Sequence, residues 1–348
     1  MEGDELNNFP RLIVLTVVSI LYCYFIAAKI PKGFLRLLSV FPVVIILLLI
    51  PFSIYSFHIG VTAWVLLWVC GFKLLLFAFD QGPLSSSSSS SSSLFDFLCQ
   101  AAFPFKIKEN PPKSKSTLSK LVPSSILEAS YKSALLALLF YSYNYKQYFP
   151  QHVLLILYFF HTYFVIQLLF NIGAIPAQVL GGAVEIEPQF EAPLLSTSLQ
   201  NFWGRRWNRR SSDMFRATIY DPVKSLFKPI IGPRWSSLPA VFVTFVVSGF
   251  IHEVLYYHIT RQFPTWEVTW FFVLQGILVD IEIFLKKKLV ETNKFRLHSA
   301  VSRPLALAIL ALIAACLSFK QLLRNGIDDK IIGEFNMFVA YLKGTALQ

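Results

Sequence analysis

The stretch Leu238–Ile259 reads LPAVFVTFVVSGFIHEVLYYHI, an apolar run that holds the adjacent ionisable residues His252 and Glu253. A helix of about 20 mainly apolar residues crosses the hydrocarbon core of a bilayer, because it satisfies its own backbone N–H and C=O groups. This stretch therefore predicts a transmembrane helix. Ionisable side chains in such a helix are costly to bury, so they also mark a candidate functional site.

Similar apolar stretches recur along the chain, which has 348 residues. Hydrophobic residues make up 55% of the chain and charged residues 15%, against about 25% charged in an ordinary soluble domain. This composition excludes a disordered chain, a coiled coil and a secreted disulfide scaffold. We predict an all-α, polytopic integral membrane protein with about eight transmembrane helices that form a bundle.

Most of the predicted spans are clear from their hydropathy, and one is weaker. The weaker span, Ser133–Phe149, is rich in tyrosine and carries Lys146. The last apolar stretch, Ile331–Leu342, is too short to cross a bilayer, so we expect it at the membrane interface. The clear spans are Leu12–Ala28, Leu37–Phe57, Val61–Phe79, Val153–Ala174, Leu238–Ile259, Val268–Leu285 and Leu305–Leu323.

The formal net charge of +11 gathers in alternate connections between the spans. Cytosolic loops of membrane proteins carry an excess of Lys and Arg, so this charge predicts a topology and requires no nucleic-acid partner. Both termini are then expected in the lumen. We expect one membrane-embedded domain, 1–348, with a flexible serine-rich cytosolic loop at 81–130 and a second cytosolic loop at 176–237. The basic connections are Lys29–Arg36, Asp80–Lys132, Pro176–Ser237 and Lys286–Arg303, and the serine run is Ser85–Ser93.

His252 is the leading catalytic candidate. At a rise of about 1.5 Å per residue from the cytosolic end of its span, it lies roughly 20 Å into the helix. A neutral imidazole there can accept a proton from a hydroxyl group without holding a permanent charge in lipid, which suits a general base. The alternative interpretation is a structural histidine that forms a hydrogen bond and faces the helix bundle.

Two hydrolytic motifs are excluded around this histidine. A zinc-protease H-E-x-x-H motif fails because Tyr256 stands where the second histidine is needed, and a G-x-S-x-G elbow around Ser248 fails because Val246 replaces the first glycine. Other ionisable residues have structural interpretations. We expect Lys73 to extend toward the interface, His161 to be packed and hydrogen-bonded, and Asp280 and Glu282 to pair with Lys286–Lys288.

The loop Ser196–Arg210, STSLQNFWGRRWNRR, is the second candidate. Trp203 and Trp207 are four residues apart, so on a helix they share one face, which could lie on the membrane surface. Arginine side chains pair with phosphate oxygens through two parallel hydrogen bonds. The alternative interpretation is a basic aromatic segment that only anchors the chain to lipid headgroups.

An intramembrane histidine that follows an aromatic, arginine-rich loop ending in Trp-Asn resembles the membrane-bound O-acyltransferase superfamily. The closer resemblance is to plant wax synthases of the jojoba type, and it extends over essentially the whole chain. The segments that carry it are Ile30–Gly33, Phe72–Phe79, Gly82–Leu84, Thr197–Gln200, Phe202–Asn208, Ser248-Gly249 and His252-Glu253.

This resemblance implies a multi-pass enzyme of the endoplasmic reticulum membrane that transfers an acyl group from acyl-CoA to a lipid alcohol inside a helical chamber. His252 matches the catalytic histidine, and Asn208 matches the second polar position of the superfamily. Acyl-CoA is a co-substrate, and the mechanism needs no metal and no other cofactor. Membrane lipids are the further expected partners. Our hypothesis for the acyl-CoA-binding residues is Gln200, Trp203, Arg205, Arg206, Trp207, Arg209 and Arg210, with the CoA phosphates near the arginines.

Several alternatives remain open at this level. The acceptor is a long-chain alcohol, a sterol or a diacylglycerol, and the donor is a long-chain acyl-CoA or acetyl-CoA. A lipid transporter would also use several spans and a basic cytosolic face, but the chain shows no internal repeat and no paired broken helices. A non-catalytic scaffold would leave the joint presence of His252 and the Trp-Asn loop unexplained.

Overall fold

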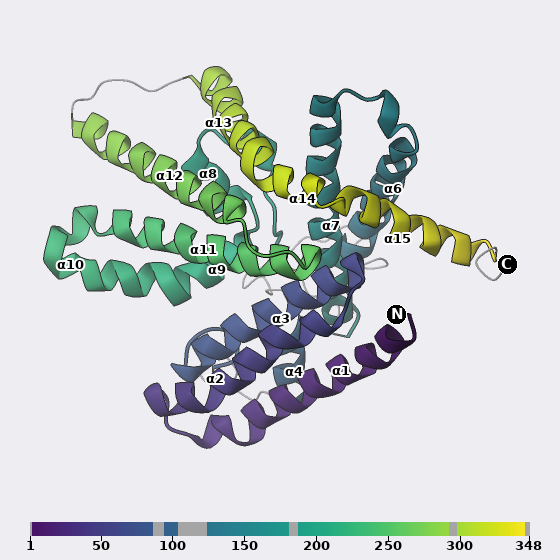
Figure 1. Ribbon diagram of the computed structural model, residues 1–348. Helices are drawn as coiled ribbons and strands as arrows, with labels where there is room; N and C mark the ends of the chain where they lie inside the picture. The colour runs from purple at the N-terminus through teal and green to yellow at the C-terminus, as the bar shows by residue number, and fades with distance from the viewer. Residues whose placement is uncertain (1, 86–93, 104–123, 181–186, 292–297, 345–348) are drawn as a thin grey trace. The chain divides into compact units, whose positions relative to one another are not determined.

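The computed structural model describes residues 2–85, 94–103, 124–180, 187–291 and 298–344. Over these ranges the regular secondary structure is helical, which confirms the all-α prediction (Figure 1). The chain divides into two compact units, one formed by Met1–Glu187 with Asp328–Gln348 and the other by Pro188–Ile327. The expectation of one membrane-embedded domain stays a prediction.

Within the described ranges, 7 helical segments are long and apolar enough to cross a membrane. They correspond to the clear spans of the sequence, so the protein is a multi-pass membrane protein. The segments are Asn8–Lys29, Phe34–Ser53, Phe57–Ala78, Gln151–Gly173, Ser237–Thr260, Glu267–Lys288 and Ser299–Arg324.

The weaker predicted span differs from the helix that the structure contains. Helix α6 (Ser124–Tyr143) has 20 residues, enough for about 30 Å, but it begins and ends earlier than the predicted Ser133–Phe149. Its first half carries an ion pair in which Lys132 Nζ lies 2.6 Å from Glu128 Oε2. Lys146 lies in the turn after the helix. The prediction from hydropathy therefore placed the span too far toward the tyrosine-rich C-terminal end of this helix.

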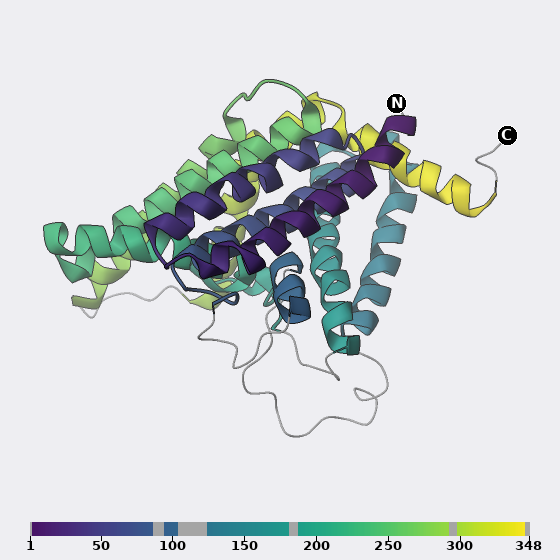
Figure 2. The same ribbon diagram turned by 90° about the horizontal axis from the view of Figure 1, so that it is seen from below.

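The N-terminal part of the first unit contains α1 (Glu2–Phe25), α2 (Phe34–Leu49), α3 (Phe57–Ala78) and α4 (Leu94–Ala102). Helices α1, α2 and α3 run side by side in Figures 1 and 2 and enclose an apolar core that includes Ile20, Leu47 and Leu74. Helix α4 packs against α1 and α3 and buries Phe97 and Ala101. Part of the predicted flexible loop 81–130 is therefore an ordered helix, because α4 has an apolar face to bury. The serine residues 86–93 lie outside the described residues.

Lys73 does not extend to the interface as we expected. Its side chain is 2% exposed, and its Nζ donates hydrogen bonds to the carbonyl oxygens of Gln100 at 2.5 Å and Phe103 at 2.6 Å. These carbonyls lie at the C-terminal end of α4, where helical C=O groups lack partners within the helix and carry partial negative charge. Lys73 therefore fixes α4 to α3.

The rest of the first unit is a hairpin of α6 and α7 (Gln151–Leu180) with helix α15 (Ile327–Leu342). Phe140 of α6 stacks on Phe335 of α15 with ring centroids 3.7 Å apart. His161 of α7 is 5% exposed and packs against Phe140, but neither ring nitrogen has a hydrogen-bond partner among the described residues. The packed position confirms our expectation, and the expected hydrogen bond is absent there.

The second unit contains short helices α8 (Leu199–Asn201) and α9 (Arg209–Phe215), followed by α10 (Asp221–Trp235), α11 (Ser237–Thr260), α12 (Glu267–Glu291), α13 (Ser299–Ile313) and α14 (Lys320–Arg324). Most of the described part of the predicted loop 176–237 is thus helical. Its apolar residues, among them Phe202, Met214 and Phe215, are buried, so its backbone must pair within helices. Residues 181–186 lie outside the described ranges.

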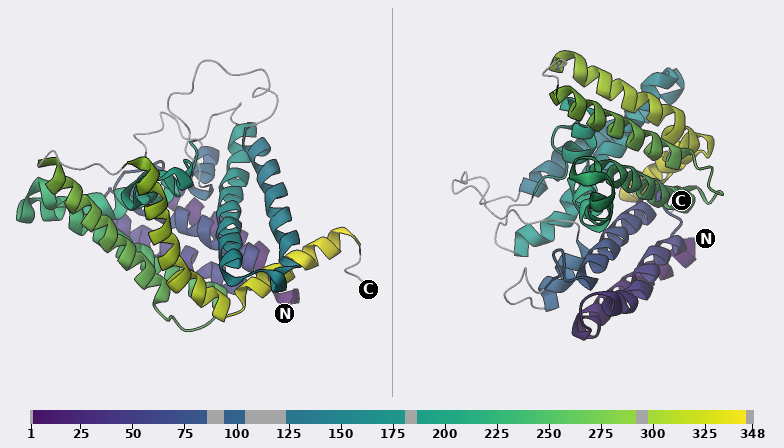
Figure 3. Two further views of the ribbon diagram at one scale, coloured as in Figure 1. Left: turned by 90° about the horizontal axis from the view of Figure 1, so that it is seen from above. Right: turned by 90° about the vertical axis from the view of Figure 1, so that its left-hand side faces the viewer.

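Helices α11 and α12 form the central contact of this unit (Figure 3). Two glycines bring them close together. A Cβ atom built on Gly276 would lie 2.8 Å from Phe245 Cβ, and one built on Gly249 would lie 3.1 Å from Thr269 Cα. Only glycine fits this packing without a shift of the helices. The close contact places residues of α12 directly against the face of α11 that carries His252.

Candidate active site

His252 of α11 is half-buried, and its ring packs on Phe272 of α12 with centroids 4.2 Å apart. Its Nδ1 lies 2.7 Å from the carbonyl oxygen of Ser248, one turn earlier in the same helix. A carbonyl oxygen only accepts hydrogen bonds, so Nδ1 carries the proton in the neutral ring. Nε2 then holds the free lone pair, and it has no hydrogen-bond partner among the described residues. This is the tautomer that a general base needs.

Glu253 has a structural role that sequence patterns did not reveal. Its carboxylate is 3% exposed and accepts hydrogen bonds from Trp266 N at 3.0 Å, Thr269 N at 3.2 Å and Thr269 Oγ1 at 2.9 Å. These N–H groups belong to the start of α12, where helical donors lack partners within the helix. A carboxylate is favourable at this end of the helix dipole. Glu253 therefore fixes the start of α12 one residue away from the candidate base.

The loop Ser196–Arg210 contacts α12 through Trp203. The Trp203 indole N–H donates a hydrogen bond to Gln275 Oε1 at 3.1 Å. The Trp203 ring also packs against Phe245 and Phe272, with centroids 5.7 and 5.9 Å away. Phe272 therefore touches both Trp203 and His252, and it joins the two candidate clusters that the sequence separates by more than forty residues. The single-turn π-helix Phe202–Arg206 presents Trp203 at this point.

Asn208 begins α9 and has φ 40°, in the left-handed region that Asn tolerates better than most residues. Its Oδ1 accepts a hydrogen bond from Ser211 N at 3.3 Å, which caps the helix. The Nδ2 group has no partner within the described part of the chain, and there is no direct hydrogen bond between Asn208 and His252 there. The neighbouring Trp207 ring stacks on Phe202 at 5.3 Å.

The four arginines of the loop occupy different environments. Arg206 donates hydrogen bonds to Asn201 Oδ1 at 2.8 Å and to the carbonyl oxygens of Glu191 and Ala192, so it holds the loop together. Arg209 forms an ion pair of 3.4 Å with Glu191, and Arg210 is buried. Arg205 is exposed and has no hydrogen bond or ion pair with any described residue. Of the four, Arg205 is therefore the most accessible to a phosphate group.

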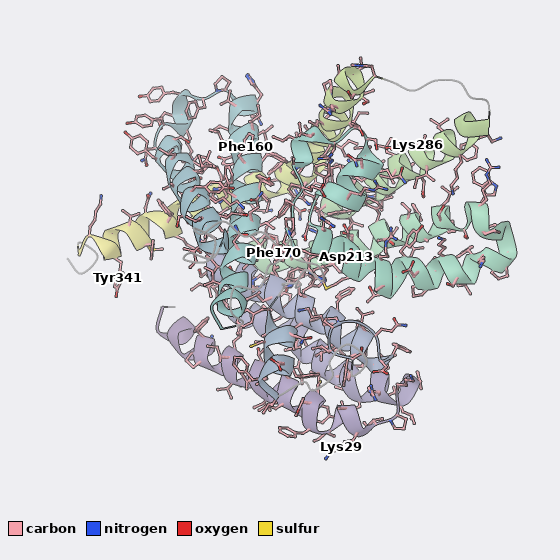
Figure 4. The ribbon with its side chains drawn as sticks, turned by 180° about the vertical axis from the view of Figure 1, so that it is seen from behind. Lys29, Phe160, Phe170, Asp213, Lys286 and Tyr341 are labelled. Carbon is pink, nitrogen blue, oxygen red and sulfur yellow. The ribbon has the colours of Figure 1, made fainter. Side chains whose placement is uncertain are left out.

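Gln200 belongs to a polar cluster at the C-terminal end of α12, where Figure 4 labels Lys286. Its Oε1 accepts a hydrogen bond from Lys286 Nζ at 3.0 Å, and its backbone N–H donates to Glu282 Oε2 at 3.1 Å. Lys286 also pairs with Glu282, as the sequence predicted. Asp280 meets that prediction in part: its carboxylate interacts electrostatically with Lys287, but its Oδ1 is buried and has no hydrogen-bond partner in the described part of the chain.

The model of the membrane bound O-acyl transferase family matches residues 186–274, a range that includes both Asn208 and His252. The chain is 37% identical over 335 residues to acyl-CoA–sterol O-acyltransferase 1 of Arabidopsis thaliana, covering 96% of each chain. It is 39% identical over 336 residues to probable long-chain-alcohol O-fatty-acyltransferase 1 of the same plant, with 95% of each chain covered. It is 37% identical over 343 residues to the long-chain-alcohol O-fatty-acyltransferase of Simmondsia chinensis, with 97% of this chain and 96% of that protein covered.

Proposed function

The chain belongs to the membrane-bound O-acyltransferase family, and we propose that it transfers a fatty acyl group from acyl-CoA to the hydroxyl of a long-chain alcohol to form a wax ester. The observation that carries this proposal is the state of His252. In the neutral ring, Nδ1 donates to Ser248 and leaves the lone pair on Nε2, and the ring packs on Phe272, which also contacts Trp203.

The reaction needs one base and one path for the proton. His252 Nε2 accepts the hydroxyl proton while the alcohol oxygen forms a bond to the thioester carbon, and the carbonyl π electrons move to the oxygen. The carbonyl then re-forms and the carbon–sulfur bond breaks. The protonated His252 returns the proton to the CoA sulfur, which leaves as a thiol. The products are an ester and free CoA.

The two substrates enter from different phases. A long-chain alcohol dissolves in the membrane, whereas the phosphates of CoA must remain in water. Arg205 lies on the loop near Trp203, is exposed and pairs with no described residue, so it is the best placed of the four arginines to pair with a CoA phosphate. Asn208 Nδ2 has no partner among the described residues, so it can donate to a reactant oxygen. Gln200, Arg206, Trp207, Arg209 and Arg210 shape the same loop.

A sterol is the second candidate acceptor. It is favoured by the 37% identity to a protein named acyl-CoA–sterol O-acyltransferase 1, which spans 96% of both chains. Both acceptors present a single hydroxyl on an apolar body, so the same base and loop serve either reaction. The shape of the apolar chamber decides between them. We place the protein in the endoplasmic reticulum membrane, with both termini in the lumen.

The test uses microsomes from a host that lacks neutral-lipid synthesis and expresses the wild type, His252→Ala or His152→Ala. His152 is an exposed histidine at the start of α7, so its variant controls for loss of an imidazole. Labelled acyl-CoAs are offered with long-chain alcohols, sterols and diacylglycerol. We expect a wax ester from the wild type and His152→Ala only. Sterol esters alone would replace the first acceptor with the second, and ester formation by His252→Ala would contradict the role of the base.

A further inference from the structure

Gln275 is a fully buried polar residue in the middle of α12, with an exposed fraction of 0%. Its Oε1 accepts the hydrogen bond from the Trp203 indole at 3.1 Å. An indole N–H can only donate, so this contact fixes the orientation of the amide: Oε1 faces Trp203 and the NH2 group faces away from it. The indole N–H therefore determines which end of the Gln275 amide carries the donor.

The Nε2 group of Gln275 is buried and has no hydrogen-bond partner among the described residues. An unpaired donor inside an apolar bundle is costly, because its lost hydration is not replaced. Buried polar groups in folded proteins are hydrogen-bonded in the great majority of cases. Among the described residues, Gln275 Nε2 is thus a donor that a ligand oxygen could satisfy.

The location of Gln275 favours the acyl group of acyl-CoA as the ligand of this donor. Phe272 precedes Gln275 by three residues, so both lie on the same face of α12. The centroid of the Phe272 ring lies 4.2 Å from that of His252 and 5.9 Å from that of Trp203. Through its Oε1, the Gln275 side chain therefore contacts the same aromatic cluster as the base. On the proposed reaction, the oxygen that gains negative charge near His252 is the thioester carbonyl oxygen, and preorganised donors stabilise such a charge strongly.

We propose that Gln275 Nε2 donates a hydrogen bond to the acyl carbonyl oxygen of the bound acyl-CoA and that Trp203 holds the amide in this orientation. The proposal rests on the acyltransferase function above. Gln275 is then a catalytic residue that contacts the reacting group, and Trp203 is a positioning residue that acts through Gln275.

The experiment measures binding of two unreactive CoA analogues of equal chain length to the purified protein in detergent. One is an S-(2-oxoalkyl)-CoA, which keeps a carbonyl group, and the other is an S-alkyl-CoA thioether, which has none. We expect the wild type to bind the ketone about fivefold more tightly, the effect of one neutral hydrogen bond. In Gln275→Met, a side chain of similar length without a donor, the two affinities should become equal. The kcat for acyl transfer should fall on the order of 100-fold.

The Trp203→Phe variant separates this role from simple anchoring. It keeps an aromatic ring but removes the indole N–H, so the amide is free to rotate and the preference for the ketone should fall partly. Adding Gln275→Met to it should abolish the remaining preference. If Gln275 only anchored Trp203, the second substitution would leave the ketone-to-thioether ratio unchanged, and that result would overturn the proposal. Trp203→Phe alone provides the test if Gln275→Met fails to fold, because an unchanged ratio there also contradicts it.

Failure of the proposed function gives a different result. If the chain does not use acyl-CoA, neither analogue binds to the wild type. If it uses acyl-CoA but Gln275 plays no part, both analogues bind and their ratio is the same in the wild type and in Gln275→Met.

Discussion

A single hydrogen bond decides which nitrogen of His252 is basic. The carbonyl oxygen of Ser248 accepts from Nδ1, so the lone pair remains on Nε2. A helical residue in the middle of a span has this carbonyl available four residues earlier, which makes the arrangement independent of any other side chain. When the ring is neutral, Nε2 is therefore the nitrogen that can accept a substrate proton.

Asn208 combines a capping oxygen with an amide donor that is unpaired in the described ranges, and two substitutions separate these functions. Asn208→Asp keeps an oxygen for the Ser211 N–H and removes the Nδ2 donor. We expect it to fold normally and to lose acyl transfer by about 100-fold, the effect of one lost donor to the transition state. Asn208→Ala should in addition cost about 1 kcal/mol of stability because the cap is lost. Full activity in Asn208→Asp would show that the residue is only a cap.

Arg205 and Arg206 are adjacent but have different surroundings, so their substitutions should have different effects. Arg205→Gln removes the accessible cation, and we expect a several-fold higher KM for acyl-CoA, an unchanged kcat and a weaker dependence of KM on salt. Arg206→Gln breaks the bonds to Asn201, Glu191 and Ala192 and should lower stability by about 1–2 kcal/mol. Steady-state kinetics and thermal unfolding in detergent measure both. Equal effects on KM would contradict the assignment.

At the scale of elements, the close packing of α11 and α12 positions the base. Gly276→Ala would place a Cβ 2.8 Å from Phe245 Cβ, inside normal contact distance. We expect this variant to lose about 1–3 kcal/mol of stability and to lower kcat, since the helices must shift and His252 packs between them. Gly333→Ala in α15 is the matched control, because its new Cβ meets nothing within 4 Å. Equal melting temperatures for the two variants would argue against tight packing at this interface.

Helix α15 is held to its own unit by Glu334. The carboxylate accepts hydrogen bonds from Phe57 N at 2.6 Å, His58 N at 3.2 Å and Ser56 Oγ at 3.1 Å, and it pairs with His58 Nδ1 at 2.9 Å. It thus caps the start of α3. Burial alone would raise the pKa of this carboxyl, but the hydrogen bonds from His58 and from the two backbone N–H groups lower it to about 2.

A lowered carboxyl pKa has a defined effect on stability. The ionised form is favoured in the folded state, so the contribution of Glu334 is fully present above its ordinary pKa of 4.5 and is lost as pH falls toward 2. The full loss amounts to about 3 kcal/mol. Thermal unfolding between pH 5 and pH 2.5 should therefore show a smaller decline for Glu334→Gln than for the wild type. Parallel curves would contradict the coupling of α15 to α3.

The contacts of α15 bring two other segments of its unit together. Lys146 lies 3.4 Å from Asp328 and also pairs with Asp329, and Lys330 donates to the carbonyl oxygen of Tyr55 at 2.7 Å. The segments near Tyr55, Lys146 and Asp328 therefore share one end of their unit. The placement of this end in the lumen stays a prediction.

Hydropathy predicted the spans because each helix in a bilayer must satisfy its own backbone, a local requirement that a single sequence records. Inspection of the sequence also singled out His252, an ionisable residue inside a span, and the Trp203 loop, by its tryptophans and arginines, and their roles stay predictions. It could not find Phe272, Gln275 or the capping role of Glu253, because these depend on how α11 and α12 pair in space. Of these three residues, only Gln275 could have been singled out from the sequence, because it is the one glutamine in the apolar span Val268–Leu285. The different environments of Arg205 and Arg206 likewise arise from the folding of the loop, so the sequence pattern could not predict them.

The most direct test of the proposed acyltransferase function is the stoichiometry of the reaction, measured with purified protein in lipid vesicles. The protein is given one long-chain acyl-CoA and one long-chain alcohol, and ester formation and release of the CoA thiol are followed together. If His252 is the base, we expect equal amounts of ester and thiol from the wild type and neither product from His252→Ala at equal protein content. Ester formation that persists without His252, or thiol release without ester, would contradict it.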